Sequence, residues 1–279
     1  MADIAELERL RWELRQDCVD IIMAGGGGHI GGDMSIMDAL LVLYANHLNV
    51  TPETAGDPNR DRFILSKGHA MEAYYAVLCN RGFLDFEDVK ARFSTFGSPY
   101  IGHPNNKLPG IEMNSGSLGH GLPVAVGMAL ATRMDGRPYR TYVFLGDGEL
   151  AEGSVWEGAM SGGSYALDNL CALVDRNRLQ ISGPTEDVMR QDPQQERWAA
   201  FGWNVISIPG NDLAALDAAF TLAQKAKGKP TVIIANTTKG YGSPVMEDKA
   251  DWHHKLPSAE EYARISADFK ARREAERHA

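Results

Sequence analysis

The sequence predicts an α/β fold with a doubly wound, mostly parallel sheet and helices on both faces. The first observation is a set of four apolar runs with the length and composition of buried strands: Thr141–Leu145, Leu170–Val174, Trp203–Ile208 and Thr231–Ala235. The second is that helical stretches near residues 153–167, 190–201 and 212–227 separate these runs. This alternation is typical of right-handed βαβ units, and near-continuous apolar strands are expected where helices cover both faces of a sheet.

Two helices are predicted at the N-terminal end. The first 24 residues carry apolar side chains at helical spacing, and this helix is expected to end at the glycine run of residues 25–28. A second helix is expected to begin at Ser35, because Asp38, three residues later, gives a pattern like a capping box.

The region before the sheet is predicted to end in a long loop. A short strand at residues 61–66 leads into a helix over Met71–Arg81. Residues 94–121 are rich in Gly, Pro, Ser and Asn and have no regular period, so we expect a functional loop there. A helix over Leu122–Met134 follows it. The tail at 263–279 is expected to be a charged helix or a frayed end, with a solvated terminus favoured.

The composition is that of a globular protein. With 44% hydrophobic and 23% charged residues, the 279-residue chain is not a disordered protein, and we expect residues 1–279 to form a single domain. A net charge of −9 argues against non-specific nucleic-acid binding. Cys18, Cys79 and Cys171 form no CxxC pair and are expected to be reduced core thiols. Without a signal-like or membrane-spanning stretch, the protein is expected to be cytoplasmic.

Polar side chains follow two of the predicted strands. Asp147 lies in Gly-Asp-Gly directly after one strand, and Asn177 follows the next strand along the chain. Because the carboxyl ends of parallel strands meet at one edge of a sheet, we expect the two side chains to converge there. A carboxylate, an amide oxygen and a main-chain carbonyl suit Mg²⁺, which often shares its coordination sphere with phosphates. Gly146 and Gly148 would let the backbone approach a diphosphate closely.

At this point the sequence resembles the transketolase-type thiamine diphosphate enzymes, whose cofactor motif is GDG followed by Asn at this spacing. Eight local sequences carry the resemblance: GHIGGDMS at 28–35, DRFILSKGH at 61–69, IGHP at 101–104, NSGSLGHG at 114–121, GDGELAEG at 146–153, DRNRLQISG at 175–183, KGYGS at 239–243 and WHH at 252–254. They match the N-terminal, diphosphate-binding domain of transketolase. The chain is therefore expected to be the N-terminal subunit of a split transketolase, with the pyrimidine-binding and C-terminal domains on a partner chain.

The resemblance implies a role for each matching residue. The implied Mg²⁺ ligands are Asp147, Asn177 and the main-chain oxygen of Leu179. The implied cofactor contacts are His69, Gly116, Ser117, Leu118, Gly148, Glu152, Asn177 and His253. Glu152 and Glu157 also match acidic residues at the subunit interface, and the surface around them and Trp156 is expected to be buried by a partner. The implied catalytic residues of the substrate channel are His29, His103 and His253.

The eight histidines fall into two groups. His47 and His278 are expected to be ordinary structural or surface residues. The other six lie in loops flanked by Gly or Pro, where catalytic groups are common: His29, His69, His103, His120, His253 and His254. Their unperturbed pKa suits proton transfer near neutral pH. His120 stands where the family commonly has Gln, and His254 where it has Gly, so the roles of these two stay open.

The implied reaction is transfer of a two-carbon glycolaldehyde unit from a ketose, by default a ketose phosphate, to an aldehyde, with thiamine diphosphate and Mg²⁺. The carboxyl group that polarises the aminopyrimidine ring belongs to the pyrimidine-binding domain in this family. A partner subunit is therefore expected, most simply in an α₂β₂ arrangement, and neither a nucleic acid nor a membrane is expected as a partner.

Two alternatives stay open from the sequence. The chain could belong to another thiamine diphosphate enzyme of the 2-oxo acid dehydrogenase type, but those enzymes lack the SKGH, GHP and WH sequences. It could also be a non-catalytic regulatory half, against which the intact Asp147 and Asn177 argue. The sequence leaves the sugar open among phosphorylated, sulfonated and branched substrates.

Overall fold

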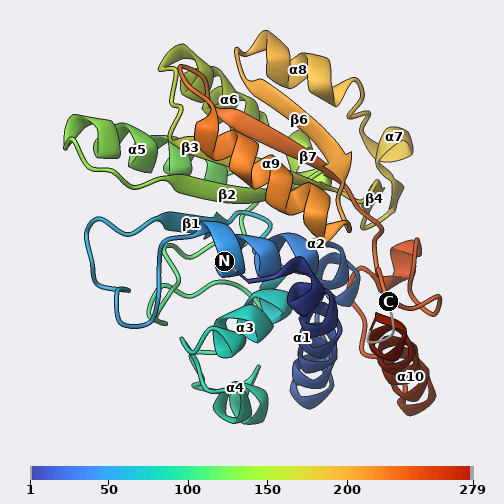
Figure 1. The fold of residues 1–279 in the computed structure, drawn as a ribbon. Coiled ribbons are helices and arrows are strands. Elements are labelled where there is room, and N and C mark those ends of the chain that lie inside the picture. The colour runs from blue at the N-terminus through green and yellow to red at the C-terminus, as the bar shows by residue number, and fades with distance from the viewer. Residues whose placement is uncertain (1, 277–279) are drawn as a thin grey trace.

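A five-stranded parallel sheet is the centre of the computed structural model, which describes residues 2–276 (Figure 1). Its strands are β1 (Arg62–Leu65), β2 (Thr141–Gly146), β3 (Leu170–Arg176), β6 (Asn204–Pro209) and β7 (Thr231–Asn236). They lie in the order β1-β2-β3-β7-β6, and every neighbouring pair is parallel. The five predicted strands are thus confirmed to within a residue or two, and their carboxyl ends share one edge.

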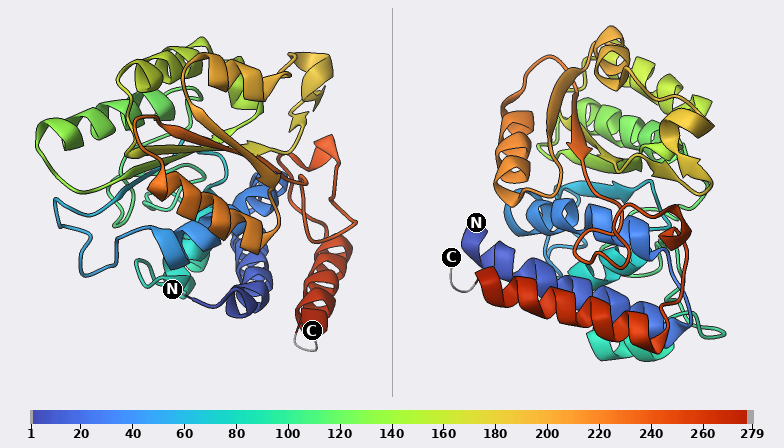
Figure 2. Two further views of the ribbon diagram at one scale, coloured as in Figure 1. Left: turned by 45° about the horizontal axis from the view of Figure 1, so that its top comes forward. Right: turned by 90° about the vertical axis from the view of Figure 1, so that its right-hand side faces the viewer.

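Helices cover both faces of this sheet, as the sequence predicts. One face carries α1 (Ile4–Gly25), α2 (Ile30–Val42), α3 (Met71–Asn80) and α9 (Leu213–Lys225). The other carries α5 (Gly121–Met134), α6 (Gly153–Ser164) and α8 (Gln194–Ala200) (Figures 1 and 2). Alternate strand residues divide between the two layers: Tyr142 and Phe144 join the first core, and Val143 and Leu145 join the second.

The predicted start of the second helix is wrong. Helix α2 begins at Ile30, and Ser35 lies inside it, where its hydroxyl donates to the carbonyl of Gly32 and to Asp175. Two glycines are tolerated in its first turns because the whole helix is buried. A Cβ on Gly31 would lie 2.5 Å from the carbonyl oxygen of Trp252, so close packing favours glycine at this position. The end of α1 is as predicted, with Gly26 in the left-handed conformation at φ 79°.

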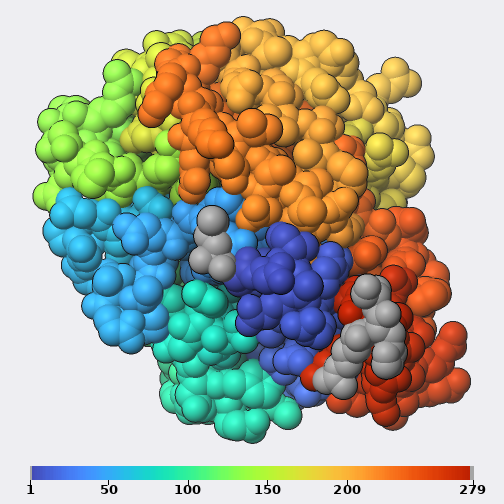
Figure 3. Space-filling view, in the orientation of Figure 1, coloured from blue at the N-terminus to red at the C-terminus, as the bar shows by residue number. Residues whose placement is uncertain are grey.

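Over the described residues the C-terminal tail is the charged helix that the sequence left open, and it packs on the fold, so the favoured solvated terminus is wrong. Residues Ala259–Glu276 form α10, which lies along α1 (Figures 2 and 3). Ile265 and Phe269 are buried there, and the Phe269 ring centroid lies 6.1 Å from that of Trp12. Only these two apolar residues of α10 are buried, and the rest of the helix surface is largely charged. Its apolar pattern is therefore too weak to predict the contact with α1 from the sequence.

Several shorter elements were not predicted. They are a π-helical turn at Leu43–His47, α4 (Phe86–Arg92), 3₁₀ turns at Gly148–Ala151 and Ala250–Trp252, the hairpin β4–β5 (Leu179–Gln180 and Gly183–Pro184) and α7 (Thr185–Val188). No helix or strand lies between α4 and α5, so the long loop of residues 94–121 is confirmed. The three cysteines are free. Among the described residues, no helix combines the length and apolar character that crossing a membrane requires.

Candidate active site

A cavity of about 370 Å³ opens at the sheet edge where β1, β2, β3 and β7 end. Its lining residues are His29, Gly32, Lys67, His69, His103, Gly116, Leu118, Gly146, Asp147, Gly148, Glu149, Asn177, Leu179, Gln180, Ile181, Ser182, Lys239 and His253. All of the site residues named from the sequence are in this set except Ser117 and Glu152, which are exposed beside it. Segments far apart in the chain therefore converge on one cavity.

Two of the three oxygens expected to bind Mg²⁺ are fixed by hydrogen bonds from backbone N–H groups. The carboxylate of Asp147 accepts hydrogen bonds from the N–H groups of Gly148 (2.8 Å) and Arg178 (2.6 Å). The side-chain oxygen of Asn177 accepts one from the N–H of Leu179 at 3.1 Å. Burial and the nearby Asp175 carboxylate raise the pKa of Asp147 to about 6. A divalent cation beside Asp147 would favour its charged form, so the donor set fits Mg²⁺.

Two buried lysines, which we did not single out from the sequence, bring positive charge to the cavity. Lys67 pairs with the fully buried carboxylate of Asp175 and donates to the carbonyl of Gly32 at 3.0 Å. Lys239 contacts His253 Nδ1 at 3.1 Å and the carbonyl of Leu179 at 3.4 Å. Among the described residues it has no carboxylate partner within ion-pair distance. Burial and the charge of Lys67 lower its pKa to about 8.

An anion in this cavity would therefore meet a buried ammonium group that lacks a counter-charge. The sequence offered a signal for both lysines, because they lie in the quoted SKGH and KGYGS motifs. Lysine is common on protein surfaces, however, and only the fold shows that these two are 1% exposed.

Four imidazole rings surround His29. The centroid of its ring lies 5.2 Å from that of His69, 5.9 Å from His103, 5.5 Å from His253 and 4.7 Å from His254. Burial and the neighbouring rings lower the pKa of His29 to about 3. Burial and the two lysines lower the pKa of His253 to about 4. The rings of His29 and His253 are therefore neutral at pH 7, so each has one N–H donor and one acceptor nitrogen to offer to a hydroxyl group.

One ring nitrogen of His29 has no hydrogen-bond partner among the described residues. The Nδ1 atom of His29 is buried and has no hydrogen-bond partner among the described residues, and the same holds for Nε2 of Gln180. The described residues contain no group of three or more His, Cys, Asp or Glu side chains placed to hold a metal ion. The arrangement of the rings suits hydrogen bonding and proton transfer to a polyhydroxy compound.

Two other described histidines, His47 and His120, do not line the cavity. His120 is exposed, and its Nδ1 lies 3.0 Å from the carbonyl of Leu118. His47 contacts Asp217 at 2.9 Å, a structural contact of the kind expected for it. The histidine at position 278 lies outside the described residues.

The loop that carries Gly116 and Leu118 is fixed by Glu149, another residue that the sequence did not single out. Its buried carboxylate accepts hydrogen bonds from the N–H of Gly119 (2.8 Å), the N–H of Gly146 (3.0 Å) and the hydroxyl of Ser66. It joins the loop to the ends of β1 and β2. Gly116 itself has φ 140°, and a Cβ there would lie 2.8 Å from His103, so this position favours glycine.

We expect Glu149→Gln to destabilise the isolated chain by about 1–3 kcal/mol. The glutamine NH₂ group would replace one carboxylate oxygen and would then face a buried hydrogen-bond donor instead of accepting from it. Glu157→Gln is the matched control, since Glu157 is exposed, and should change the free energy of unfolding by less than about 0.5 kcal/mol. Denaturant unfolding of the two variants measures the difference. Equal stability would show that the Glu149 contacts do not anchor the loop.

The surface that the sequence analysis expects a partner to bury is partly exposed in this chain. Glu152 and Glu157 are exposed on and next to α6. Trp156 is half-buried, donates from Nε1 to the carbonyl of Leu150 at 2.8 Å and packs on Trp198. Met160, one turn further along α6, is 52% exposed.

Comparison with known proteins gives a match over nearly the whole chain. Residues 8–272 match the family described as "Transketolase, thiamine diphosphate binding domain". An apulose-4-phosphate transketolase subunit of Phocaeicola vulgatus is 47% identical over 248 residues, which cover 89% of this chain and 88% of that protein. A 6-deoxy-6-sulfo-D-fructose transketolase subunit of Clostridium sp. is 39% identical over 249 residues, covering 88% of this chain and 89% of that one.

Full-length transketolases match over part of their length. The human enzyme is 40% identical over 243 residues, or 87% of this chain and 38% of its own. The crystal structure of transketolase from Campylobacter jejuni superimposes with a TM-score of 0.90 at 28% identity, covering 99% of this chain and 46% of that one.

Proposed function

The chain belongs to the transketolase family by its thiamine diphosphate binding domain, and from this premise we propose that it is the diphosphate-binding subunit of a heteromeric transketolase that uses Mg²⁺. One observation carries the proposal: a carboxylate, an amide oxygen, a buried unpaired lysine and neutral histidines meet in one cavity at the carboxyl edge of the sheet. The relatives are named transketolases, which favours this reading over an enzyme of the 2-oxo acid dehydrogenase type.

The chemistry of the lining residues fits the diphosphate end of the cofactor. Asp147, Asn177 and the carbonyl of Leu179 would hold Mg²⁺, and Lys239 would balance the charge of the diphosphate. Gly148 lines the cavity beside Asp147, and a Cβ there would lie 3.0 Å from the side chain of Gln180. When bound, thiamine diphosphate supplies a carbanion sink to the reaction. The loop around Ser117 and the exposed Glu152 would contact the cofactor from the cavity mouth.

The histidines would handle the protons of the sugar. His29, His103 and His253 present neutral rings, so each can accept a proton from a substrate hydroxyl at one nitrogen or donate one from the other. His69 lies at 5.3 Å from His253, ring centroid to ring centroid, and would contact the cofactor. Because the rings are neutral, the positive charge of the cavity is concentrated at the lysines, near the anionic group.

The donor sugar is proposed from the relatives. The 47% identical subunit is named for apulose 4-phosphate and the 39% identical one for 6-deoxy-6-sulfo-D-fructose. We take a phosphorylated ketose as the first donor to test, with the sulfonated sugar as the second. Product masses from both donors, measured with a common aldehyde acceptor, would identify the substrate.

The partner is proposed to carry the pyrimidine-binding domain and to cover the surface around Glu152, Trp156 and Glu157. Both subunit relatives match this chain over most of their own length, which supports a separate second chain. Two-fold symmetry makes α₂β₂ the simplest closed assembly. We place the assembly in the cytoplasm, a compartment that keeps thiols such as the three free cysteines reduced.

We expect the purified chain alone to transfer no two-carbon unit, and activity to appear when a partner chain that carries the pyrimidine-binding domain is added. The physical reason is that this chain supplies groups for the diphosphate end of the cofactor, and the acid for the aminopyrimidine ring has to come from elsewhere. Light scattering and a ketose-donor assay on the chain, the partner and their mixture provide the test. Full activity of the lone chain would refute the heteromeric proposal, and an inactive mixture that still binds cofactor would favour a regulatory half.

A further inference from the structure

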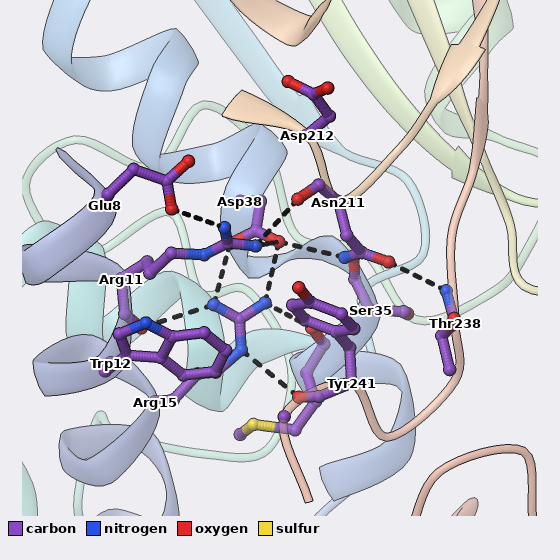
Figure 4. Close-up of polar contacts among 12 residues, drawn as sticks. Glu8, Arg11, Trp12, Arg15, Ser35, Asp38, Asn211, Asp212, Thr238 and Tyr241 are labelled. Atoms are coloured by element: carbon purple, nitrogen blue, oxygen red, sulfur yellow. Dashed lines mark hydrogen bonds and ion pairs between the residues drawn. The ribbon is translucent and has the colours of Figure 1, made fainter. Parts of the chain in front are cut away.

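A cluster of buried ions lies between α1 and α2 (Figure 4). The carboxylate of Asp38 is fully buried and accepts two hydrogen bonds from Arg11, at 3.0 and 2.6 Å, and two from Arg15, at 2.7 and 2.9 Å. Burial raises its pKa, but the two arginines outweigh burial and hold the pKa below its ordinary value. Two forked arginine contacts fix the orientation of the carboxylate. We call these three residues the Asp38 cluster.

Asn211 joins the Asp38 cluster to another part of the chain. It lies between β6 and α9, and its side-chain NH₂ donates to Asp38 at 2.9 Å. Its main-chain carbonyl accepts a hydrogen bond from Arg11 at 2.8 Å. Its side-chain oxygen accepts one from the N–H of Thr238 at 2.9 Å. Both ends of the amide are therefore occupied, and the amide can satisfy both contacts in only one orientation.

The segment that Asn211 holds carries Lys239. Thr238 directly precedes the lysine, and two residues beyond it the carbonyl of Tyr241 accepts from Arg15 Nε at 3.3 Å. The Tyr241 ring faces both guanidinium groups, whose Cζ atoms lie 5.2 and 5.1 Å from its centroid. The Asp38 cluster thus holds the backbone on each side of Lys239, through Asn211 before it and through Arg15 after it (Figure 4).

We propose that Asn211 is a positioning residue for the cofactor site, which holds Lys239 at the cavity by tying the Thr238 backbone to the Asp38 cluster. This inference rests on the proposed function, in which Lys239 faces the diphosphate. A long, flexible lysine contributes most to binding when its backbone is fixed, because less side-chain and loop freedom is lost when the anion binds.

A purely structural role for the same contacts makes a different prediction. In that case loss of Asn211 would lower the stability of the fold without acting through Lys239. Asp38 is unsuitable for separating the two roles, because removing it would leave two buried arginines unpaired and could unfold the protein. Asn211 is half-buried and uncharged, so Asn211→Ala keeps the ion pairs intact.

The test is a double-mutant cycle on the complex with the partner subunit. Calorimetry measures the affinity for thiamine diphosphate at saturating Mg²⁺ in the wild type, Asn211→Ala, Lys239→Ala and the double variant. Asp212→Ala is the matched control, because it removes the N-terminal cap of α9, a hydrogen bond of 3.0 Å to the N–H of Ala215, beside Asn211. Among the described residues, the Asp212 side chain makes no hydrogen bond to Thr238 or to Asp38. Thermal unfolding of each variant is measured in parallel.

We expect Asn211→Ala to weaken cofactor binding roughly tenfold, as is common for residues that orient a ligand group, and to have no further effect when Lys239 is already alanine. Asp212→Ala should lower the melting temperature and leave the affinity unchanged. Equal losses from Asn211→Ala in both backgrounds, or no loss in either, would overturn the positioning role. If Lys239→Ala binds the cofactor as tightly as the wild type, the assignment of Lys239 in the proposed function fails, and this outcome is distinct from failure of the Asn211 proposal alone.

Discussion

Replacing Asp147 with alanine is expected to abolish Mg²⁺-dependent binding of thiamine diphosphate. Asp147 is the only carboxylate in the proposed metal set, and it is 2% exposed at the end of β2. Without it, only Asn177 and a main-chain carbonyl would hold the divalent cation on the protein, and neither carries a net negative charge to balance it. Calorimetry of the complex with the partner subunit measures the loss directly.

The control for this experiment lies at the opposite edge of the sheet. Asp168 precedes β3, and its carboxylate accepts a hydrogen bond from the N–H of Gly228 at 3.0 Å. Asp168→Ala removes a carboxylate and a backbone contact of the same kind, but at a distance from the cavity lining. We expect its cofactor affinity to equal that of the wild type. Unchanged affinity in Asp147→Ala would remove Asp147 from the metal site.

His103→Ala is expected to slow turnover by roughly 10²–10⁴-fold, the usual contribution of a general acid or base. The His103 ring lines the cavity beside His29 and Gly116. Burial lowers its pKa, so it is neutral at pH 7 and can accept a proton from a substrate hydroxyl. The proposed metal ligands lie on other segments of the chain, so cofactor affinity should be retained.

Steady-state kinetics with a ketose donor test this prediction, together with calorimetry of the cofactor. A fall in kcat with cofactor affinity unchanged would place His103 in the chemical steps. Wild-type turnover would take His103 out of the reaction. A parallel loss of cofactor affinity would mean that the ring mainly supports the Gly116 loop, against which it packs.

The sequence was informative wherever the decisive pattern was local. The apolar strands, the glycine end of α1 and the long loop of residues 94–121 were predictable, because each depends on neighbouring residues. Asp147 and Asn177 could be placed together because the parallel sheet brings all strand ends to one edge. The family was also recognisable, since its motifs are short and contiguous.

The sequence misled where a distant contact overrode a local preference. Ser35 has the local pattern of a helix cap, but its hydroxyl bonds to Asp175, which is 140 residues away. The α10 segment has a weak apolar pattern, and it is helical against α1 because Ile265 and Phe269 find a partner surface there. In both cases packing against a distant segment contributes more than the intrinsic preference of the segment itself.

By itself the sequence determined the fold class, the family and the oxygen ligands proposed for the metal. Only the tertiary structure decided the electrostatics of the site. Burial neutralises His29 and His253 and lowers the pKa of Lys239, and burial is a property of the folded chain. The same holds for the Asp38 cluster, where Arg11 meets Asn211 across 200 residues. Such contacts depend on where segments meet in space, which local spacing does not encode.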